Sequence, residues 1–252
     1  MTAPDFDLGA DAYRRRIRLT TAANGAVTSV LEDDFHHFVV TLAHDGERVT
    51  TVGCEAVRWP WSTCPGAAEP LRRLEGMSLS DRFTAAGVWT DPKQCCTHQF
   101  DAACHAITHA ATGRQTRVYD VEIPRRDPAT GTTRARLWVD GEPALTWIVT
   151  WEGISEPTPD LAGAPWKGGF MRWADANLAP DAAERAIVLR RACDIGMGRG
   201  MDLDAIAEAS LLPPSMAGVC HTMQPLVIGA ATRHVGSIRD FAMRPDDLAA
   251  ER

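Results

Sequence analysis

A histidine and a glutamate predicted to meet across two strands are the residues best suited to chemistry in this sequence. The runs 35–42 and 47–59 are rich in β-formers and are joined by Asp45-Gly46, a pair that favours a two-residue hairpin loop. That loop would place His36 opposite Glu55, with their Cβ atoms ~5 Å apart. A carboxylate fixes the tautomer of a partly buried imidazole and raises its basicity, so this pair could move a proton near neutral pH. The alternative is a purely structural ion pair.

The side chains of the first of these strands alternate between an apolar and a more polar face. His36 shares the apolar face with Phe38, Val40 and Leu42, and we expect this face to point toward the core. The pairing depends on the register, because a slip of one residue moves every side chain of a strand to the other face.

A second histidine, His98, begins a predicted helix over 97–111. The positive end of the helix dipole would act on this first turn, so the neighbouring Cys96 thiol could have a lowered pKa. The alternatives are a His98 bonded to local backbone and a simply buried cysteine. His105 and His109 lie opposite the apolar stripe of the helix, and we expect both to face solvent.

The pattern of elements predicts an α+β fold. We expect an antiparallel, strongly curved or barrel-like sheet packed on the helix at 97–111, followed by a helical C-terminal part with helices at 181–195 and 202–209. A single domain over 1–252 is expected, with the sheet and central helix in 14–153 and a helical extension in 154–252. The predicted strands are 14–21, 26–32, 35–42, 47–59, 117–123, 133–139 and 144–151.

Charge and motifs exclude several classes of protein. With 26 basic and 33 acidic residues the net charge is −7, which disfavours nucleic-acid and anionic-membrane partners. The sequence contains neither a phosphate-binding loop nor a dinucleotide fingerprint, so we expect no nucleotide cofactor. No apolar run approaches the ~20 residues of a membrane span. The seven cysteines are an odd number and the start of the chain is polar, so we expect reduced thiols and a cytoplasmic protein.

Several short motifs keep a characteristic order along the chain. They are His36 at the start of a strand, Asp45-Gly46, Glu55-Ala56, Cys64-Pro65, Leu74-Glu75-Gly76 and Cys96-Thr97-His98, followed less distinctly by Cys220-His221-Thr222 and Arg239-Asp240-Phe241. In this order they resemble the bacterial domain-of-unknown-function family DUF2889. Cys95 departs from the pattern, which usually has glycine before the Cys-Thr-His motif. The resemblance implies no activity, but it singles out His36 and Glu55.

Exclusion leaves an enzyme that needs no cofactor as the leading hypothesis. We expect a lyase that performs elimination or retro-aldol cleavage on a small hydrophobic or aromatic compound. His36 would be the base, Glu55 its partner, and His98 or His221 the acid or oxyanion donor. We expect a pocket lined by tryptophans, in which the residues that contact the substrate are Trp59, Trp61, Phe38, Cys96 and Arg239.

Two further hypotheses remain open at this stage. A zinc or iron site could form from three of the side chains of His36, Glu55, His98, Cys96 and His221, and would support hydrolase or lyase chemistry. The pocket could also bind a small molecule without turning it over. A homo-oligomer is left open.

Overall fold

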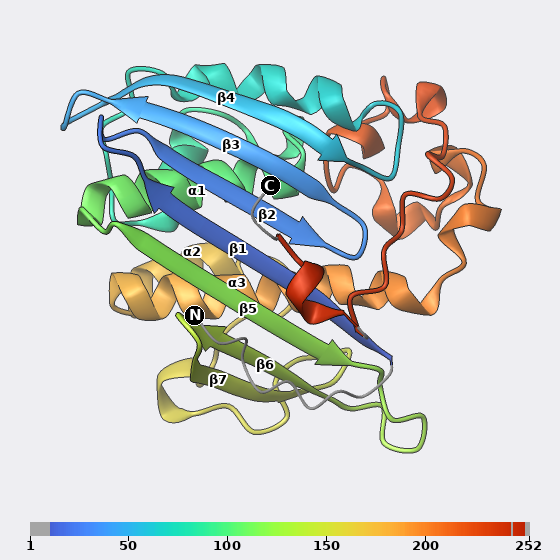
Figure 1. Cartoon of the computed structure of the whole chain (residues 1–252). Helices are drawn as coiled ribbons and strands as arrows, with labels where there is room; N and C mark the ends of the chain where they lie inside the picture. Colours follow the sequence, from blue (N-terminus) through green and yellow to red (C-terminus); the bar gives the residue numbers. More distant parts are fainter. Residues whose placement is uncertain (1–10, 243, 250–252) are drawn as a thin grey trace.

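The computed structural model describes residues 11–242 and 244–249. A seven-stranded antiparallel sheet in the order β4-β3-β2-β1-β5-β6-β7 forms its centre (Figure 1). From β1 the chain runs outward to β4, crosses through helix α1, and returns beside β1 as β5. The strands are β1 (Ala12–Thr21), β2 (Val27–Asp33), β3 (His37–His44), β4 (Val49–Arg58), β5 (Thr116–Pro124), β6 (Thr133–Val139) and β7 (Glu142–Val149).

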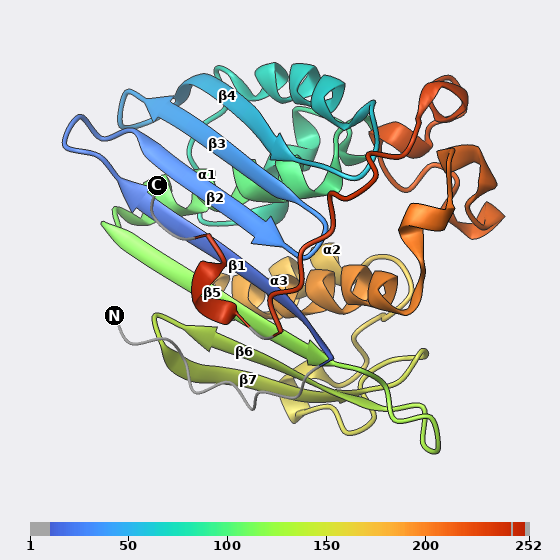
Figure 2. The same cartoon turned by 45° about the vertical axis from the view of Figure 1, so that its right-hand side comes forward.

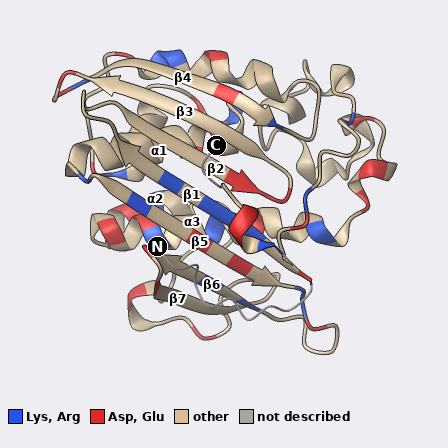
Figure 3. Cartoon of the chain, in the orientation of Figure 1, with Lys and Arg blue, Asp and Glu red and all other residues tan. Residues whose placement is uncertain are grey.

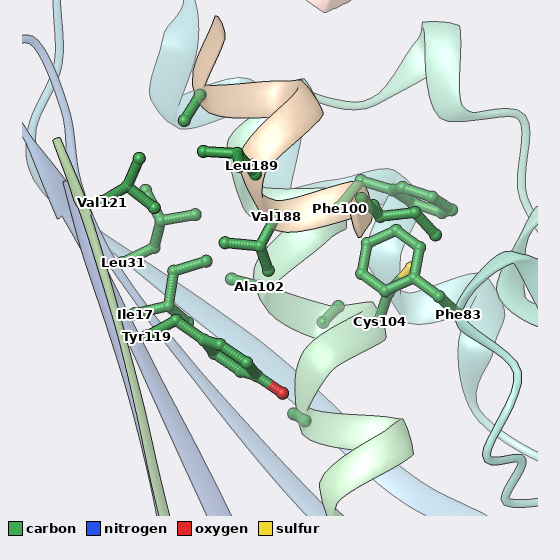
Figure 4. Packing of buried hydrophobic residues seen from close by; sticks show 14 of the residues in the cluster. Ile17, Leu31, Phe83, Phe100, Ala102, Cys104, Tyr119, Val121, Val188 and Leu189 are labelled. Atoms are coloured by element: carbon green, nitrogen blue, oxygen red, sulfur yellow. The ribbon is translucent and has the colours of Figure 1, made fainter. Parts of the chain in front are cut away.

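Helices cover one face of this sheet (Figure 2). Helix α1 (Thr97–Thr112) packs on β2 and β3, and α3 (Pro180–Gly196) packs on β5, β6 and β7, with α2 (Phe170–Asn177) against α3. Gly113 ends α1 with a φ of 63°, which a glycine adopts without strain. Figure 4 shows the core between the two helices and the sheet, including Ile17, Leu31, Tyr119, Val121, Ala102, Cys104, Val188 and Leu189.

The predicted antiparallel α+β class is confirmed, but the expectation of a strongly curved or barrel-like sheet is wrong. Strands β4 and β7 lie at opposite edges of the sheet, and among the described strands they do not pair. Two helices side by side on one face need a broad, open surface, so the sheet gains its cover from α1 and α3 rather than from closure.

The predicted register of the β3–β4 hairpin is also wrong. Leu42 pairs with Val52, three residues beyond the expected Val49, because the loop spans four residues instead of two and a bulge between Ala43 and His44 adds one more residue. The Asp45 side chain accepts hydrogen bonds from the backbone N–H groups of Glu47 at 2.9 Å and Arg48 at 2.8 Å. This Asx turn stabilises the longer loop.

The predicted solvent-facing histidines of α1 are buried. The side chain of His105 is only 2% exposed, and its Nδ1 lies 2.7 Å from Glu184 Oε1 on α3. His109 is equally buried. The face of α1 opposite the apolar stripe meets a second helix instead of water, and a polar pair there satisfies the buried imidazole of His105.

The C-terminal part contains the α-helices α2 and α3 and then short 3-10 turns. The predicted helix at 202–209 is wrong, because Glu208 is extended and bridges to Thr232. The division into a sheet part and a C-terminal extension within one domain stays a prediction.

The last described residues return over the sheet face that the helices leave free (Figure 1). The guanidinium of Arg16 donates to the carbonyl of Leu248, and the backbone N–H of Ala249 donates to Glu32 Oε2 at 2.7 Å. Figure 3 shows basic residues along β1 and acidic residues on the neighbouring β2 and β5. None of the helices in the described part of the chain has the length and apolar character that crossing a membrane requires.

Two glycines at the end of α3 provide a matched test of this packing. A Cβ on Gly196 would lie 3.2 Å from the ring of the buried Tyr13, whereas a Cβ on Gly200 would meet nothing within 4 Å. Gly196→Ala should therefore lower the free energy of unfolding by about 1–3 kcal/mol through overpacking, despite alanine's better helix propensity. Gly200→Ala should change it by less than about 0.5 kcal/mol. Urea unfolding of both variants checks this, and equal stabilities would contradict the packing.

Candidate functional site

The turn between β2 and β3 places a histidine against a buried aspartate. Asp33 is the last residue of β2, and its Oδ1 accepts the backbone N–H of Phe35 at 2.9 Å and of His36 at 2.8 Å. Such a turn is typical of aspartate, whose short side chain can bond its own following backbone. The chain is thereby folded back, and His36 Nδ1 comes to 3.0 Å from the same carboxylate oxygen.

Two residues of β1 bind the other carboxylate oxygen. Tyr13 and Arg15 lie two apart, so both side chains point to the helix-covered face. The Tyr13 hydroxyl donates to Asp33 Oδ2 at 2.7 Å and the Arg15 guanidinium donates to it at 2.9 Å. Arg15 also donates to the Tyr13 oxygen at 2.8 Å, which closes a small network.

The aspartate is ionised in this setting. Burial alone would raise the pKa of Asp33, but the charges of His36 and Arg15 and the hydrogen bond from His36 hold it well below its usual value. Asp33 has no solvent exposure. A carboxylate fixed in this way is an acceptor only, so the hydrogen between it and His36 belongs to the imidazole.

His98 enters the site from the first turn of α1. Its ring stacks on that of His36 with centroids 3.6 Å apart, and its Nε2 lies 3.5 Å from Asp33 Oδ2. Burial, reinforced by the neighbouring His36, lowers the pKa of His98 to about 3. The imidazole of His98 is therefore neutral at physiological pH.

A buried arginine from β4 holds the backbone of the turn. The Arg58 guanidinium donates to the carbonyls of Asp33 at 2.6 Å, Asp34 at 3.0 Å and His36 at 3.1 Å. Its remaining contacts include Glu32 at 3.1 Å. Because one planar guanidinium binds three carbonyls of the turn, the turn has little freedom to move His36 away from Asp33.

The predicted pairing of His36 with Glu55 is wrong. Glu55 lies opposite Val39 on β4, and its side chain is exposed. The longer loop shifts β4 by two residues and the bulge between Ala43 and His44 by one more, so the total shift is odd and Glu55 moves to the face away from the helices. The carboxylate that meets His36 is Asp33.

Four of the predicted substrate contacts share one apolar cluster, which reaches the histidines through Phe38 and Cys96. Phe38, Trp61 and Cys96 belong to one buried apolar cluster, with Trp59 packed at its margin; we call these four residues the Phe38 cluster. The Phe38 ring lies 5.9 Å from that of His36. Whether these residues contact a substrate stays a prediction.

Of the two interpretations of Cys96, the geometry supports the simply buried cysteine rather than the reactive thiol. Cys96 is the N-cap of α1, and its Sγ lies 3.9 Å from Nδ1 of His98. Burial raises the pKa of this thiol well above its usual value, which outweighs the positive helix end. Cys96 therefore contributes a small apolar surface and a weak donor.

The two remaining candidates occupy the C-terminal part. His221 Nδ1 lies 3.2 Å from the carbonyl of Gln94, and its backbone N–H donates to Cys95. Arg239 is exposed, and its backbone N–H donates to the carbonyl of Asp34 at 2.8 Å. The backbone of Arg239 therefore adjoins the turn that carries His36. His221 instead contacts Gln94 and Cys95, the residues that precede α1 in the sequence.

Three side chains could hold a metal ion. The ligand atoms of Asp33, His36 and His98 lie within 4.8 Å of one another, and all three residues are buried. Two histidines and one carboxylate form a ligand set found in zinc and non-haem iron sites. The set differs from the one expected from the sequence, which contained Glu55, Cys96 and His221 instead of Asp33.

Sequence reasoning missed Asp33, Tyr13 and Arg15. A usable signal was present for Asp33, because an aspartate three residues before a histidine at a strand end is suited to an Asx turn. The period-two spacing of Tyr13 and Arg15 indicated a shared face, but not that this face is buried.

The neutral state of His98 predicts a pH dependence of stability. Its folded pKa of about 3 lies below the ~6.5 of an unfolded histidine, so the unfolded chain binds more protons between these values. Acidification through this window should lower the free energy of unfolding by up to about 1.4 kcal/mol per pH unit. In His98→Gln this slope should shrink. Urea unfolding between about pH 4.5 and 6.5 measures it, and an unchanged slope would refute the assignment.

Comparison of the chain with known proteins found no relative: no family model, curated protein or solved structure matches it.

Proposed function

We propose that this protein is an enzyme that transfers protons through His36, held by Asp33, and that it needs no nucleotide cofactor. The observation that carries the proposal is the 3.0 Å contact between His36 Nδ1 and the buried, ionised carboxylate of Asp33. The same logic as in the sequence-based hypothesis applies, with Asp33 in the place of Glu55.

The contact decides which nitrogen of His36 acts as the base. An ionised carboxylate accepts, so Nδ1 carries the hydrogen and Nε2 keeps its lone pair. The His36 side chain is 11% exposed, whereas that of Asp33 is fully buried. When Nε2 takes a proton, the carboxylate stabilises the imidazolium.

Tyr13 and Arg15 act as positioning residues. They bind the Asp33 oxygen that His36 does not use, and so fix the direction of the other oxygen. His98 stacks on His36 as a neutral ring, which limits rotation of the imidazole without adding a second positive charge.

A lyase acting on a small hydrophobic or aromatic compound suits this arrangement. In a retro-aldol cleavage His36 would take the hydroxyl proton, the C–C bond would break, and its electrons would move toward the substrate's carbonyl. The imidazolium would then return the proton to the new carbanion. The apolar Phe38 cluster next to the histidines favours an apolar substrate.

Proton transfer can be tested in heavy water before the natural substrate is known. Aromatic ketones and aromatic β-hydroxycarbonyl compounds are incubated with the protein in D₂O, and deuterium uptake or cleavage is followed by NMR. Wild type should accelerate one class, and His36→Gln should lower that rate by about 100-fold or more.

Two further variants separate the two carboxylates. Asp33→Asn should also be strongly impaired, whereas Glu55→Gln should keep the wild-type rate, because its side chain is exposed and distant in register. Full activity in His36→Gln would contradict the proposal. Saturable binding of these compounds without exchange or cleavage would instead show a binding protein.

A metal-dependent enzyme is the second candidate, favoured by the convergence of Asp33, His36 and His98. Two features oppose it. Asp33 already accepts from five donors, more than the roughly four acceptor positions of a carboxylate. The two rings also stack at 24°, so their in-plane lone pairs do not meet at one point without side-chain rotation.

Elemental analysis distinguishes these candidates. Protein purified without chelator should contain less than about 0.1 equivalent of zinc or iron, and exchange activity should survive dialysis against a chelator. Near-stoichiometric metal in wild type that is lost in His98→Gln, together with loss of activity on chelation, would establish the metal site instead.

A further inference from the structure

A pocket of about 190 Å³ lies at the end of the sheet where β5 finishes and α3 ends. Residues from the end of β5 and the loop after it, from the loop after β7 and from the end of α3 line it, among them Ile123, Arg126, Trp151, Met197 and Arg199. An apolar cavity of roughly 150 Å³ suffices to bind benzene, so this pocket can take one ring with a small substituent. It shares no residue with the Asp33–His36–His98 site.

Arg126 supplies a positive charge that no carboxylate of the described residues neutralises by contact. Its guanidinium donates to the carbonyls of Gly131 at 2.9 Å, Val149 at 2.8 Å and Thr150 at 3.3 Å. Among the described residues no acidic side chain forms an ion pair with it, although the field of Glu152 reaches it. A partly buried cation without a counter-ion favours the binding of an anion.

The other two arginines of the pocket are already compensated. Arg199 contacts Asp34 at 2.6 Å, Asp240 at 3.2 Å and Asp11 at 3.5 Å. Arg125 is exposed and pairs with Asp11 at 3.3 Å. The end of α3 adds a partial negative charge on that side. The anchor for an anion is therefore Arg126.

An aromatic surface adjoins this cation. Trp151 is 53% exposed, and the Arg126 guanidinium lies 4.3 Å from its ring centroid. Stacking fixes the orientation of the guanidinium fork, which then presents its free donors in a defined plane. Ile123 and Met197 supply further apolar surface in the lining.

We propose that this pocket is a binding site for a small aromatic carboxylate, whose carboxylate binds Arg126 and whose ring packs against Trp151, Ile123 and Met197. The proposal is independent of proton transfer by His36. A flat ring fits the volume, and a carboxylate matches the planar donor geometry of arginine.

Titration calorimetry with benzoate, and with benzamide as its neutral match, tests the charge requirement. Wild type should bind benzoate with a dissociation constant of about 1 mM or lower and benzamide at least about tenfold more weakly. Cyclohexanecarboxylate, which has the charge without the flat ring, should bind several-fold more weakly than benzoate. No saturable binding of benzoate up to about 10 mM, or equal binding of benzamide, would overturn the proposal.

Variants locate the site. Arg126→Met should weaken benzoate binding at least about tenfold, whereas Arg134→Met, which removes an exposed arginine of β6, should leave it unchanged. Trp151→Ala alters an exposed side chain, so it stays informative if Arg126→Met fails to fold; it should weaken binding about five- to tenfold. Unchanged affinity in Trp151→Ala, or an equal loss in Arg134→Met, would refute the assignment.

Discussion

The buried carboxylate of Asp33 is the interaction on which the site depends. A carboxylate without solvent contact is costly unless it is compensated, and here a tyrosine, an arginine, a histidine and two backbone N–H groups provide the compensation. These donors and the charge stabilise one another, so the geometry of His36 is a consequence of satisfying Asp33. Loss of one donor would leave a buried charge partly uncompensated.

The fold brings the donors together from separate parts of the chain. Strand β1 is central and carries Tyr13 and Arg15 on its helix-covered face. The β2–β3 turn supplies Asp33 and His36, and the first turn of α1 stacks His98 on the His36 ring. The sheet and the helix packed on it therefore position the acceptor Asp33, the base His36 and the stacked ring of His98. Arg58 from β4 binds the backbone of the turn.

The local sequence pattern predicted the strands and the α1 helix better than it predicted the register between neighbouring strands. The seven predicted strands and the helix starting at Thr97 are present, because period and turn signals are local properties. The β3–β4 register was not predictable from the Asp-Gly pair, since the Asp45 side chain favours a longer loop. Asp33 was hidden within a run of three acidic residues, all of them buried, and only the tertiary structure shows that Asp33 is the one that meets His36.

The protonation of the His36 ring tests the central claim most directly. Nitrogen-15 and proton NMR of the histidine side chains at neutral pH distinguishes the two neutral tautomers. The account predicts a hydrogen on Nδ1 of His36, with a downfield proton signal that disappears in Asp33→Asn, and a lone pair on Nε2. A His36 ring that carries its hydrogen on Nε2 and leaves Nδ1 bare would contradict the account, because Asp33 could then not hold the base.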